Sequence, residues 1–352
     1  MKKIQQFLFA AISVLFALSI AAESFAETTV GGTIDVRGRW RDNNDDLNKD
    51  NSGSTALWEQ KVNLWIDAKI AEGLKGYVEL QSRGADGFQT WGAARTNTDA
   101  APNSFMNENR GFSAMNIRYA YIDFMIPKTP VGIKIGHFPV VLGHSIWADT
   151  SYWGSDGLLI YSSPIKELMI GLGTLKGFET ATNSERADAD LYVLMANYTF
   201  IPKNTAGFNA SYITRSGGKN NILGNTYWSG LSADGAAFNA INDMKFWNIM
   251  LTVDGSLDFG LNYKFEIDKQ FGKMTTGATT GTATASDFKT SGLAFLLGAG
   301  YGIGEIAEVK FNAAYGSGDK CATWSGTNNG DACSSNGDKF EGYFSFKTTA
   351  IL

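Results

Sequence analysis

Apolar and polar residues alternate between Leu257 and Ile267. Every second position there carries an apolar side chain, and charged residues such as Lys264 and Glu266 lie between them. The stretch 306–316 repeats the pattern. A period of two predicts a strand with one apolar and one polar face. Such strands recur along the chain with no helical pattern to cover their apolar faces, so the pattern indicates that lipid covers them.

The same period predicts fourteen strands, joined by connections that alternate between short and long. Alternating turn lengths are typical of outer-membrane barrels, whose antiparallel strands follow sequence order. Closure is expected because unpaired backbone groups in hydrocarbon cost several kcal/mol each. The predicted class is therefore all-β, a transmembrane antiparallel up-and-down β-barrel. A soluble sandwich of hairpins is the alternative. The predicted strands are 32–41, 57–70, 74–83, 114–126, 131–137, 157–162, 166–177, 190–201, 206–214, 245–253, 257–267, 291–302, 306–316 and 339–349.

The N-terminus has the pattern of a secretory signal peptide. Lys2 and Lys3 precede an apolar run over 7–22, and the small residues around Ala26 form a cleavage site. The run is shorter than the ~20 residues that a spanning helix needs, which argues against a membrane anchor. We therefore expect residues 1–26 to be removed and residues 27–352 to form the barrel in a bacterial outer membrane.

Composition and cysteine usage fit an exported β protein. The chain has 40 glycines and only 6 prolines, and its net charge of −5 is too small and too evenly spread to indicate a nucleic-acid partner. Cys321 and Cys333 lie in a stretch rich in glycine and small polar residues, and we expect them to form a disulfide in an oxidising compartment. No cofactor, metal site or haem attachment motif is predicted.

Two short passages resemble a known family. The first is Arg118 to Phe124, a tight turn, Ile133 to Pro139 and then Leu142-Gly143, and the second is Gly316 to Asp319. Both are similar to passages of Gram-negative porin-like barrels, including the alginate-export type. The resemblance implies an outer-membrane barrel in contact with lipid and lipopolysaccharide, with a homotrimer left open. Such barrels have sixteen or eighteen strands, which this chain would reach if its C-terminus is incomplete.

If the apolar side chains face lipid, parity assigns the alternate positions to the lumen. Arg118 is a conflict, because its parity points it to lipid, and we expect it to reach the membrane interface instead. Three arginines on one strand would favour anions, or would be paired with neighbouring acids. The predicted pore-lining residues are Arg37, Arg39, Arg41, Lys61, Asp67, Lys69, Glu79, Arg83, Tyr121, Asp123, Lys134, Lys264, Glu266, Glu308 and Lys310.

Two long connections, 84–113 and 138–156, are candidates to fold inward as a constriction, and the second is the more apolar. Aromatic residues at strand ends, for example Trp40 and Trp247, are expected in interfacial girdles. We find no recognisable nucleophile motif, so an enzyme is not predicted. The sequence favours a diffusion channel for small hydrophilic or ionic solutes. The alternative is a barrel that serves as a scaffold or sleeve for a partner, such as an electron-transfer conduit or a surface adhesin.

Overall fold

The computed structural model describes residues 27–41, 55–82, 88–90, 115–178, 189–215, 241–276, 286–304, 307–317, 339–340, 343 and 346–347. Every regular element among them is a β-strand, and none of these residues belongs to a helix that could cross a membrane. The chain divides into two compact units, residues 1–127 and 128–352, which are described separately.

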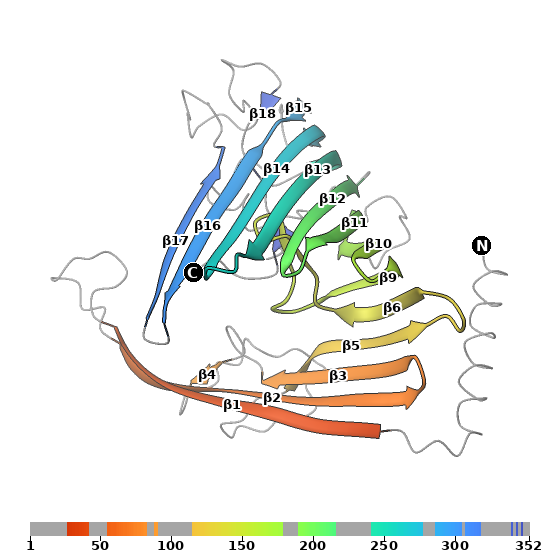
Figure 1. Ribbon diagram of the computed structural model, residues 1–352, viewed down its shortest axis with the longest axis vertical. Coiled ribbons are helices and arrows are strands. Elements are labelled where there is room, and N and C mark those ends of the chain that lie inside the picture. The colour runs from red at the N-terminus through yellow and green to blue at the C-terminus, as the bar shows by residue number, and fades with distance from the viewer. Residues whose placement is uncertain are drawn as a thin grey trace, which may run out of the picture. The chain divides into compact units, whose positions relative to one another are not determined.

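The first unit is an antiparallel sheet that follows sequence order. The order is β1-β2-β3-β5, and the short β4 pairs with β2 beyond the end of β3 (Figure 1). Consecutive strands give this order because each hairpin places neighbours in the sequence side by side, and the two-residue turn of Glu72 and Gly73 joins β2 to β3. The strands are β1 (Glu27–Arg41), β2 (Thr55–Ala71), β3 (Leu74–Ser82), β4 (Gln89–Thr90) and β5 (Met115–Met125).

The second unit continues the same up-and-down pattern. β6 pairs with β9, and β9 to β14 then pair in sequence order, followed by β16 and β17, while β15 pairs with the far end of β14 (Figure 1). The strands are β6 (Val131–Phe138), β9 (Ser155–Ile165), β10 (Leu168–Phe178), β11 (Ala189–Ile201), β12 (Asn204–Arg215), β13 (Ile241–Ser256), β14 (Leu261–Thr276), β15 (Ser286–Thr290), β16 (Leu293–Ile303) and β17 (Ala307–Gly316). A small second sheet contains β7 (Val141–Leu142), β8 (Ala148–Asp149) and β19 (Phe346–Lys347), and β18 (Lys339–Phe340) pairs with β15.

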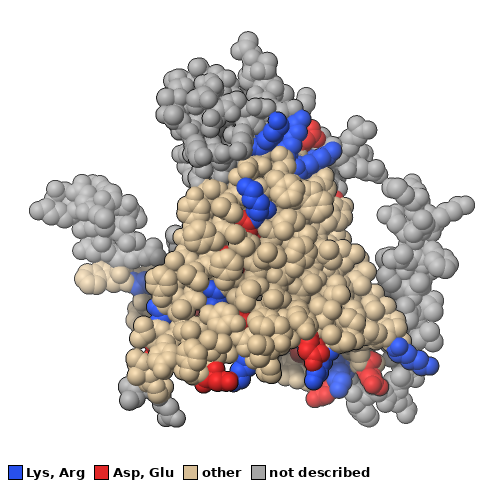
Figure 2. All heavy atoms as spheres, turned by 45° about the horizontal axis from the view of Figure 1, so that its top comes forward, with Lys and Arg blue, Asp and Glu red and all other residues tan. Residues whose placement is uncertain are grey.

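Each sheet has an apolar face and a polar face, as the alternation predicts. In the first unit Val30, Ile66 and Val78 are cross-strand neighbours on the apolar face, and their exposed fractions are 70%, 47% and 40%. A soluble protein rarely exposes so large a contiguous apolar surface. Figure 2 shows wide areas without charged side chains, with most of the charged groups gathered near the borders. This surface is the one that we expect lipid to cover.

The apolar face of the second unit carries a row of aromatic rings near one end of the strands. Tyr192, Tyr212, Trp247 and Phe271 are cross-strand neighbours on four consecutive strands. The Tyr192 and Tyr212 rings stack at 6.5 Å between centroids, and the Tyr212 and Trp247 rings lie 4.7 Å apart. Aromatic girdles of this kind mark the membrane–water interface in barrels. The row therefore has the form expected of an interfacial girdle.

Two predicted strands need correction, and the short strand β15 was not predicted. The strand placed at 257–267 begins only at Leu261, because Leu257 to Gly260 form the turn after β13, and Gly260 has φ of 90°. Phe259 therefore lies in a turn. The strand at 339–349 is wrong in its described part, which holds only the two-residue strands β18 and β19. Strand β15, which pairs with the long end of β14, has too short a pattern for the period of two to reveal.

Several predictions concern residues outside the described part of the chain. They are the signal peptide over 1–26, Arg83 and the pair Cys321 and Cys333, and they stay predictions. Arg41 ends β1, and its backbone alone is described.

Candidate functional site

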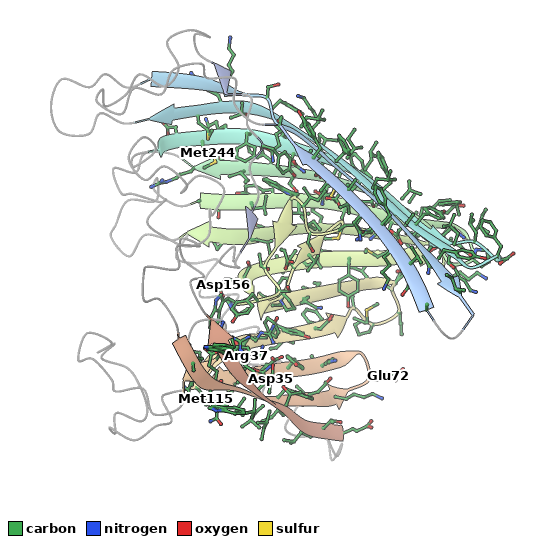
Figure 3. All side chains as sticks on the ribbon, turned by 90° about the vertical axis from the view of Figure 1, so that its left-hand side faces the viewer. Asp35, Arg37, Glu72, Met115, Asp156 and Met244 are labelled. Atoms are coloured by element: carbon green, nitrogen blue, oxygen red, sulfur yellow. The ribbon has the colours of Figure 1, made fainter. Side chains whose placement is uncertain are left out.

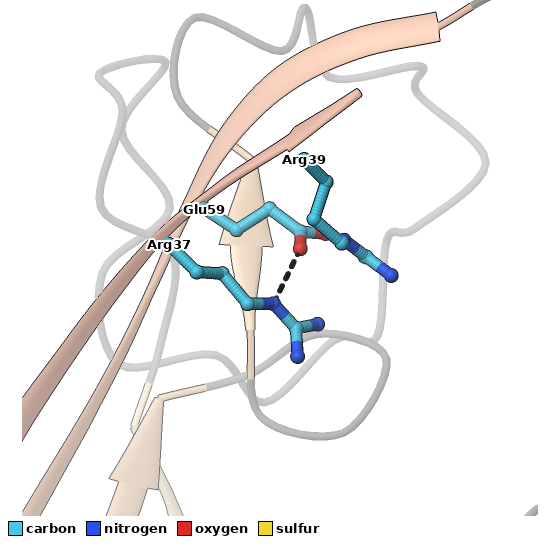
Figure 4. A network of polar contacts seen from close by, with 3 residues as sticks. All are labelled: Arg37, Arg39 and Glu59. Carbon is cyan, nitrogen blue, oxygen red and sulfur yellow. Dashed lines mark hydrogen bonds and ion pairs between the residues drawn. The ribbon is translucent and has the colours of Figure 1, made fainter. Parts of the chain in front are cut away.

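The polar face of the first unit holds a charge cluster between two strands. Glu59 on β2 is the direct cross-strand neighbour of Arg37 on β1. Its carboxylate accepts a hydrogen bond of 2.8 Å from Arg37 Nε and one of 2.5 Å from Arg39 Nη2 (Figure 4). The Glu59 side chain is 7% exposed, whereas the two arginine side chains are 34% and 30% exposed. Two arginines thus share one buried acid, and the cluster has a formal charge of +1.

An aromatic ring packs on this cluster. Phe88 is 8% exposed, and the guanidinium carbon of Arg37 lies 3.4 Å from its ring centroid. The ammonium group of Lys61 lies 4.7 Å from the same centroid. Phe88 precedes β4, whose pairing with β2 continues past the end of β3 and positions the ring. Cation–π contacts fix the two cations against the wall.

Arg118 lies on the polar face and does not point to lipid. The register between β3 and β5 pairs Glu79 with Tyr119 and Leu80 with Ile117, so Arg118 is the extra residue of a β-bulge. A bulge resets the alternation, and both Arg118 and Tyr119 then face the same side. Arg118 Nη1 donates to Glu79 Oε1 at 2.7 Å. The expectation that Arg118 would reach the membrane interface is therefore wrong.

Glu79 has a second partner in the same unit. Tyr77 donates its hydroxyl hydrogen to Glu79 Oε2 at 2.8 Å, and the Tyr77 ring stacks on Tyr121 with 5.2 Å between centroids. Nearer the short turn, Lys75 pairs with Asp67 at 2.8 Å. The polar face is thus a network of paired charges and tyrosines rather than a row of free cations.

In the second unit the connection after β6 folds over the polar face, as predicted for the apolar loop. We call residues 139–154 the inner segment. Val140 and Thr150 close it through their backbone groups, with Thr150 N donating to Val140 O at 2.8 Å. Trp147 is fully buried, and its ring meets Phe246 of β13 edge to face at 5.8 Å. Phe246 and Met250 of β13 are buried beneath the inner segment, so this part of the face is apolar.

A buried carboxylate fixes the inner segment to the sheet. Glu266 on β14 is fully buried and accepts hydrogen bonds from the backbone N–H groups of His144 and Ile146. Gly143 has φ of 58°, and a Cβ there would lie 2.4 Å from Glu266 Oε2. Only glycine allows so close an approach of backbone and carboxylate. Burial also lowers the pKa of the His144 imidazole, which favours its neutral form.

The structure places the remaining predicted residues on the polar face without testing their role in a pore. Lys69 and Asp123 belong to the first unit, and Lys134 lies on β6 with its ammonium group 6.0 Å from the Phe138 ring centroid. Lys264, Glu308 and Lys310 come together at the other edge of the second unit.

Sequence reasoning placed Arg118 on the wrong face and missed four members of the site, Glu59, Lys75, Tyr77 and Phe88. Glu59 lies two positions before Lys61 on β2 and therefore faces the same side. It could have been found by applying the alternation to every charged residue of β2. Arg118 could not, because a bulge leaves no clear sign in a single sequence. His137 belongs to the passage that resembles porin-like barrels, and it lies on the apolar side, where its Nδ1 is 2.8 Å from Oδ1 of its cross-strand neighbour Asp156.

The chain has distant structural likenesses to porins. A mutant of the Rh. blastica porin matches with 11% identity and a TM-score of 0.38, covering 82% of this chain and 94% of that one. Pseudomonas putida OprB matches with 11% identity and a TM-score of 0.39, covering 83% of this chain and 89% of that one. Pseudomonas aeruginosa OccD3 matches with 14% identity and a TM-score of 0.40, covering 86% of this chain and 61% of that one. No protein-family model and no curated protein matches the chain.

The chain has an all-β fold of the up-and-down type. Its own features decide this: long antiparallel strands in sequence order, one exposed apolar face, and one face of paired charges. The likenesses are too distant to carry an argument about function.

Proposed function

We propose that the protein is an outer-membrane channel for the passive diffusion of small hydrophilic or ionic solutes. The observation that carries the proposal is the opposite character of the two faces of each sheet. Ile34 and Trp40 are 74% and 76% exposed on one face, while Arg37, Arg39 and Glu59 form an ionic cluster on the other. In a membrane barrel the first face meets lipid and the second lines water.

Closure of the sheet into a barrel is part of this proposal. A strand edge in hydrocarbon would leave its backbone N–H and C=O groups without partners, at a cost of several kcal/mol for each group. The predicted signal peptide would bring the chain to the compartment from which such barrels assemble.

The proposed channel has a charged wall with little net charge in the first unit. Arg37 and Arg39 share Glu59, Arg118 pairs with Glu79, and Lys75 pairs with Asp67. Paired charges of both signs along a wall favour neither anions nor cations strongly. Such a channel selects solutes mainly by their size and by the local electric field at the wall. The inner segment occupies part of the polar face and would narrow the path.

Conductance tests the proposal directly. The purified protein should run faster unheated than boiled on a detergent gel, and it should give stepwise currents in planar bilayers. A folded protein that gives no current would contradict the channel and favour the alternative, a barrel that serves as a scaffold or sleeve for a partner. Fractionation should find the protein in the outer membrane, and recovery from the periplasm would contradict the location.

A further inference from the structure

A cavity on the polar face of the second unit combines two lysines, two asparagines and two glycines. Its volume is about 280 Å³, just below the ~300–1,000 Å³ typical of small-molecule sites. It lies over strands β14, β16 and β17. The side chains on the polar face around it are Asn262, Lys264, Glu308, Lys310 and Asn312, and Gly298 and Gly300 form its floor.

The strand register arranges these residues in two rows. One row runs Lys264, Gly298, Asn312 across the three strands, and the next runs Asn262, Gly300, Lys310. The lysines therefore occupy one diagonal of the cavity and the asparagines occupy the other. With strands about 4.8 Å apart, β14 and β17 are separated by roughly 10 Å, which flexible lysine side chains on opposite sides can bridge.

The glycines are required for this space. A Cβ at position 298 would lie 2.5 Å from Lys264 Cε and 2.8 Å from Asn312 Oδ1. A Cβ at position 300 would lie 3.3 Å from Glu308 Oε1. The Lys264 side chain thus extends across Gly298 toward β17, and any larger residue at 298 would displace it.

Charge decides which ligand suits the cavity. Lys310 pairs with Glu308 at 2.7 Å, whereas Lys264 makes no ion pair within the described part of the chain, although Asp254 is its cross-strand neighbour on β13. The two lysines and Glu308 leave a formal charge of +1, and two amide groups can donate further hydrogen bonds. Ammonium and amide donors that converge on one space bind oxyanions.

We propose that this cavity is a binding site for a small oxyanion, of the carboxylate or phosphate type, on the wall of the channel. The proposal rests on the proposed function, because it names the class of solute that the channel would hold briefly in passage. Lys264 and Lys310 supply the charge, Asn262 and Asn312 orient the ligand, and Gly298 keeps the space open. Glu308 opposes binding by holding Lys310 and by repelling the anion.

Binding and conductance are measured separately on the folded full chain. Malonate and inorganic phosphate are titrated into the detergent-solubilised protein by calorimetry at low salt, and each is then tested as a blocker of chloride current in planar bilayers. We expect both probes to bind. The Lys264→Gln/Lys310→Gln variant should weaken binding at least tenfold, and Gly298→Ala should also weaken it without a change of charge. Molar salt should abolish binding, because screening then falls to about 3 Å.

Two variants provide controls. Glu308→Gln should tighten binding about twofold to threefold, since it frees Lys310, and Lys134→Gln on β6 should leave the affinity within twofold. All variants are first shown to keep the unheated gel band of the folded protein. If malonate binds and phosphate does not, the site selects carboxylates, and the reverse result assigns it to phosphate.

The outcomes separate this site from the channel itself. Binding without current would keep the site and overturn the channel, and current without binding of either probe would overturn the site alone. Equal loss of affinity in Lys134→Gln and in the double variant would also overturn it, because the effect would then come from net charge and not from the cavity.

Discussion

Replacement of Glu59 by Gln tests whether the polar face lines an ion path. The carboxylate holds Arg37 and Arg39 together, and the cluster of three carries a charge of +1. Glu59→Gln raises this charge to +2, whereas the Arg37→Gln/Arg39→Gln variant lowers it to −1. Glutamine keeps an oxygen that can accept from either arginine, so the geometry should survive. The two variants should therefore shift ion selectivity in opposite directions.

The size of the effect follows from Coulomb's law with screening. One unit charge acts on an ion 8 Å away in water with about 0.5 kcal/mol, and screening at physiological salt reduces this to roughly 0.2 kcal/mol. The effect has opposite signs for a cation and an anion, so the permeability ratio changes about twofold for each unit of charge. Glu59→Gln should favour anions about twofold. The double arginine variant should favour cations about fourfold.

Reversal potentials in a tenfold salt gradient measure this ratio. A twofold change from a non-selective channel corresponds to roughly 15 mV, given ~59 mV for a tenfold ratio. Glu72→Gln is the matched control, because it removes the same charge at the turn after β2, about 40 Å along the strand from Glu59 (Figure 3). Equal reversal potentials for Glu59→Gln and Glu72→Gln at low salt would refute the reasoning and place the ion path elsewhere.

Three further predictions concern assembly, the inner segment and the cysteines. Phe311→Arg should impair membrane assembly, because a cation on the lipid face of a barrel strand costs about 2–4 kcal/mol, while the neighbouring Lys310→Ala should assemble normally. Unheated gel bands of equal strength for the two variants would show that the two faces are misassigned. Glu266→Ala should destabilise the docking of the inner segment by about 1–3 kcal/mol, because two backbone N–H groups lose their acceptor. Hydrogen exchange should then become faster in residues 139–154, and faster exchange confined to the first and last strands would contradict this. Cys321 and Cys333 should resist thiol reagents until reduced, and labelling of the native protein would exclude the disulfide.

The alternation of apolar and polar residues predicted the strands well wherever a strand has one apolar face and one polar face. It placed β1 to β3 and β9 to β12 close to their observed bounds, because apolar side chains dominate the exposed side of the sheet there, although Leu191 and Ile213 are apolar and buried on the other side. It failed at the turn of Leu257 to Gly260, where apolar residues continue the pattern although the backbone reverses. Composition cannot detect this reversal, because Gly260 alone provides the positive φ that the turn needs.

The site was only partly predictable for a different reason. Parity states which face a residue occupies, but not which residues pair, and pairing depends on the register between strands. The diagonal of Lys264 and Lys310 exists only because β14, β16 and β17 align Gly298 and Gly300 between them. A register shift of one residue in β14 or in β17 would turn the lysine of that strand toward the apolar face.

Pairing of charges explains where selectivity should arise. Arg37, Arg39 and Arg118 are each held by a glutamate, so an ion that passes them meets opposite charges within one screening length. Lys264 has no such partner among the described residues and lies at a cavity that a solute can enter. The arginine cluster also keeps a charge of +1, but its cations are already bound to Glu59 and packed on Phe88, whereas the ammonium group of Lys264 is in no ion pair of the described residues and can contact a solute. Solute preference should therefore follow Lys264 more closely than the three arginines, although the arginines are the more prominent feature of the sequence.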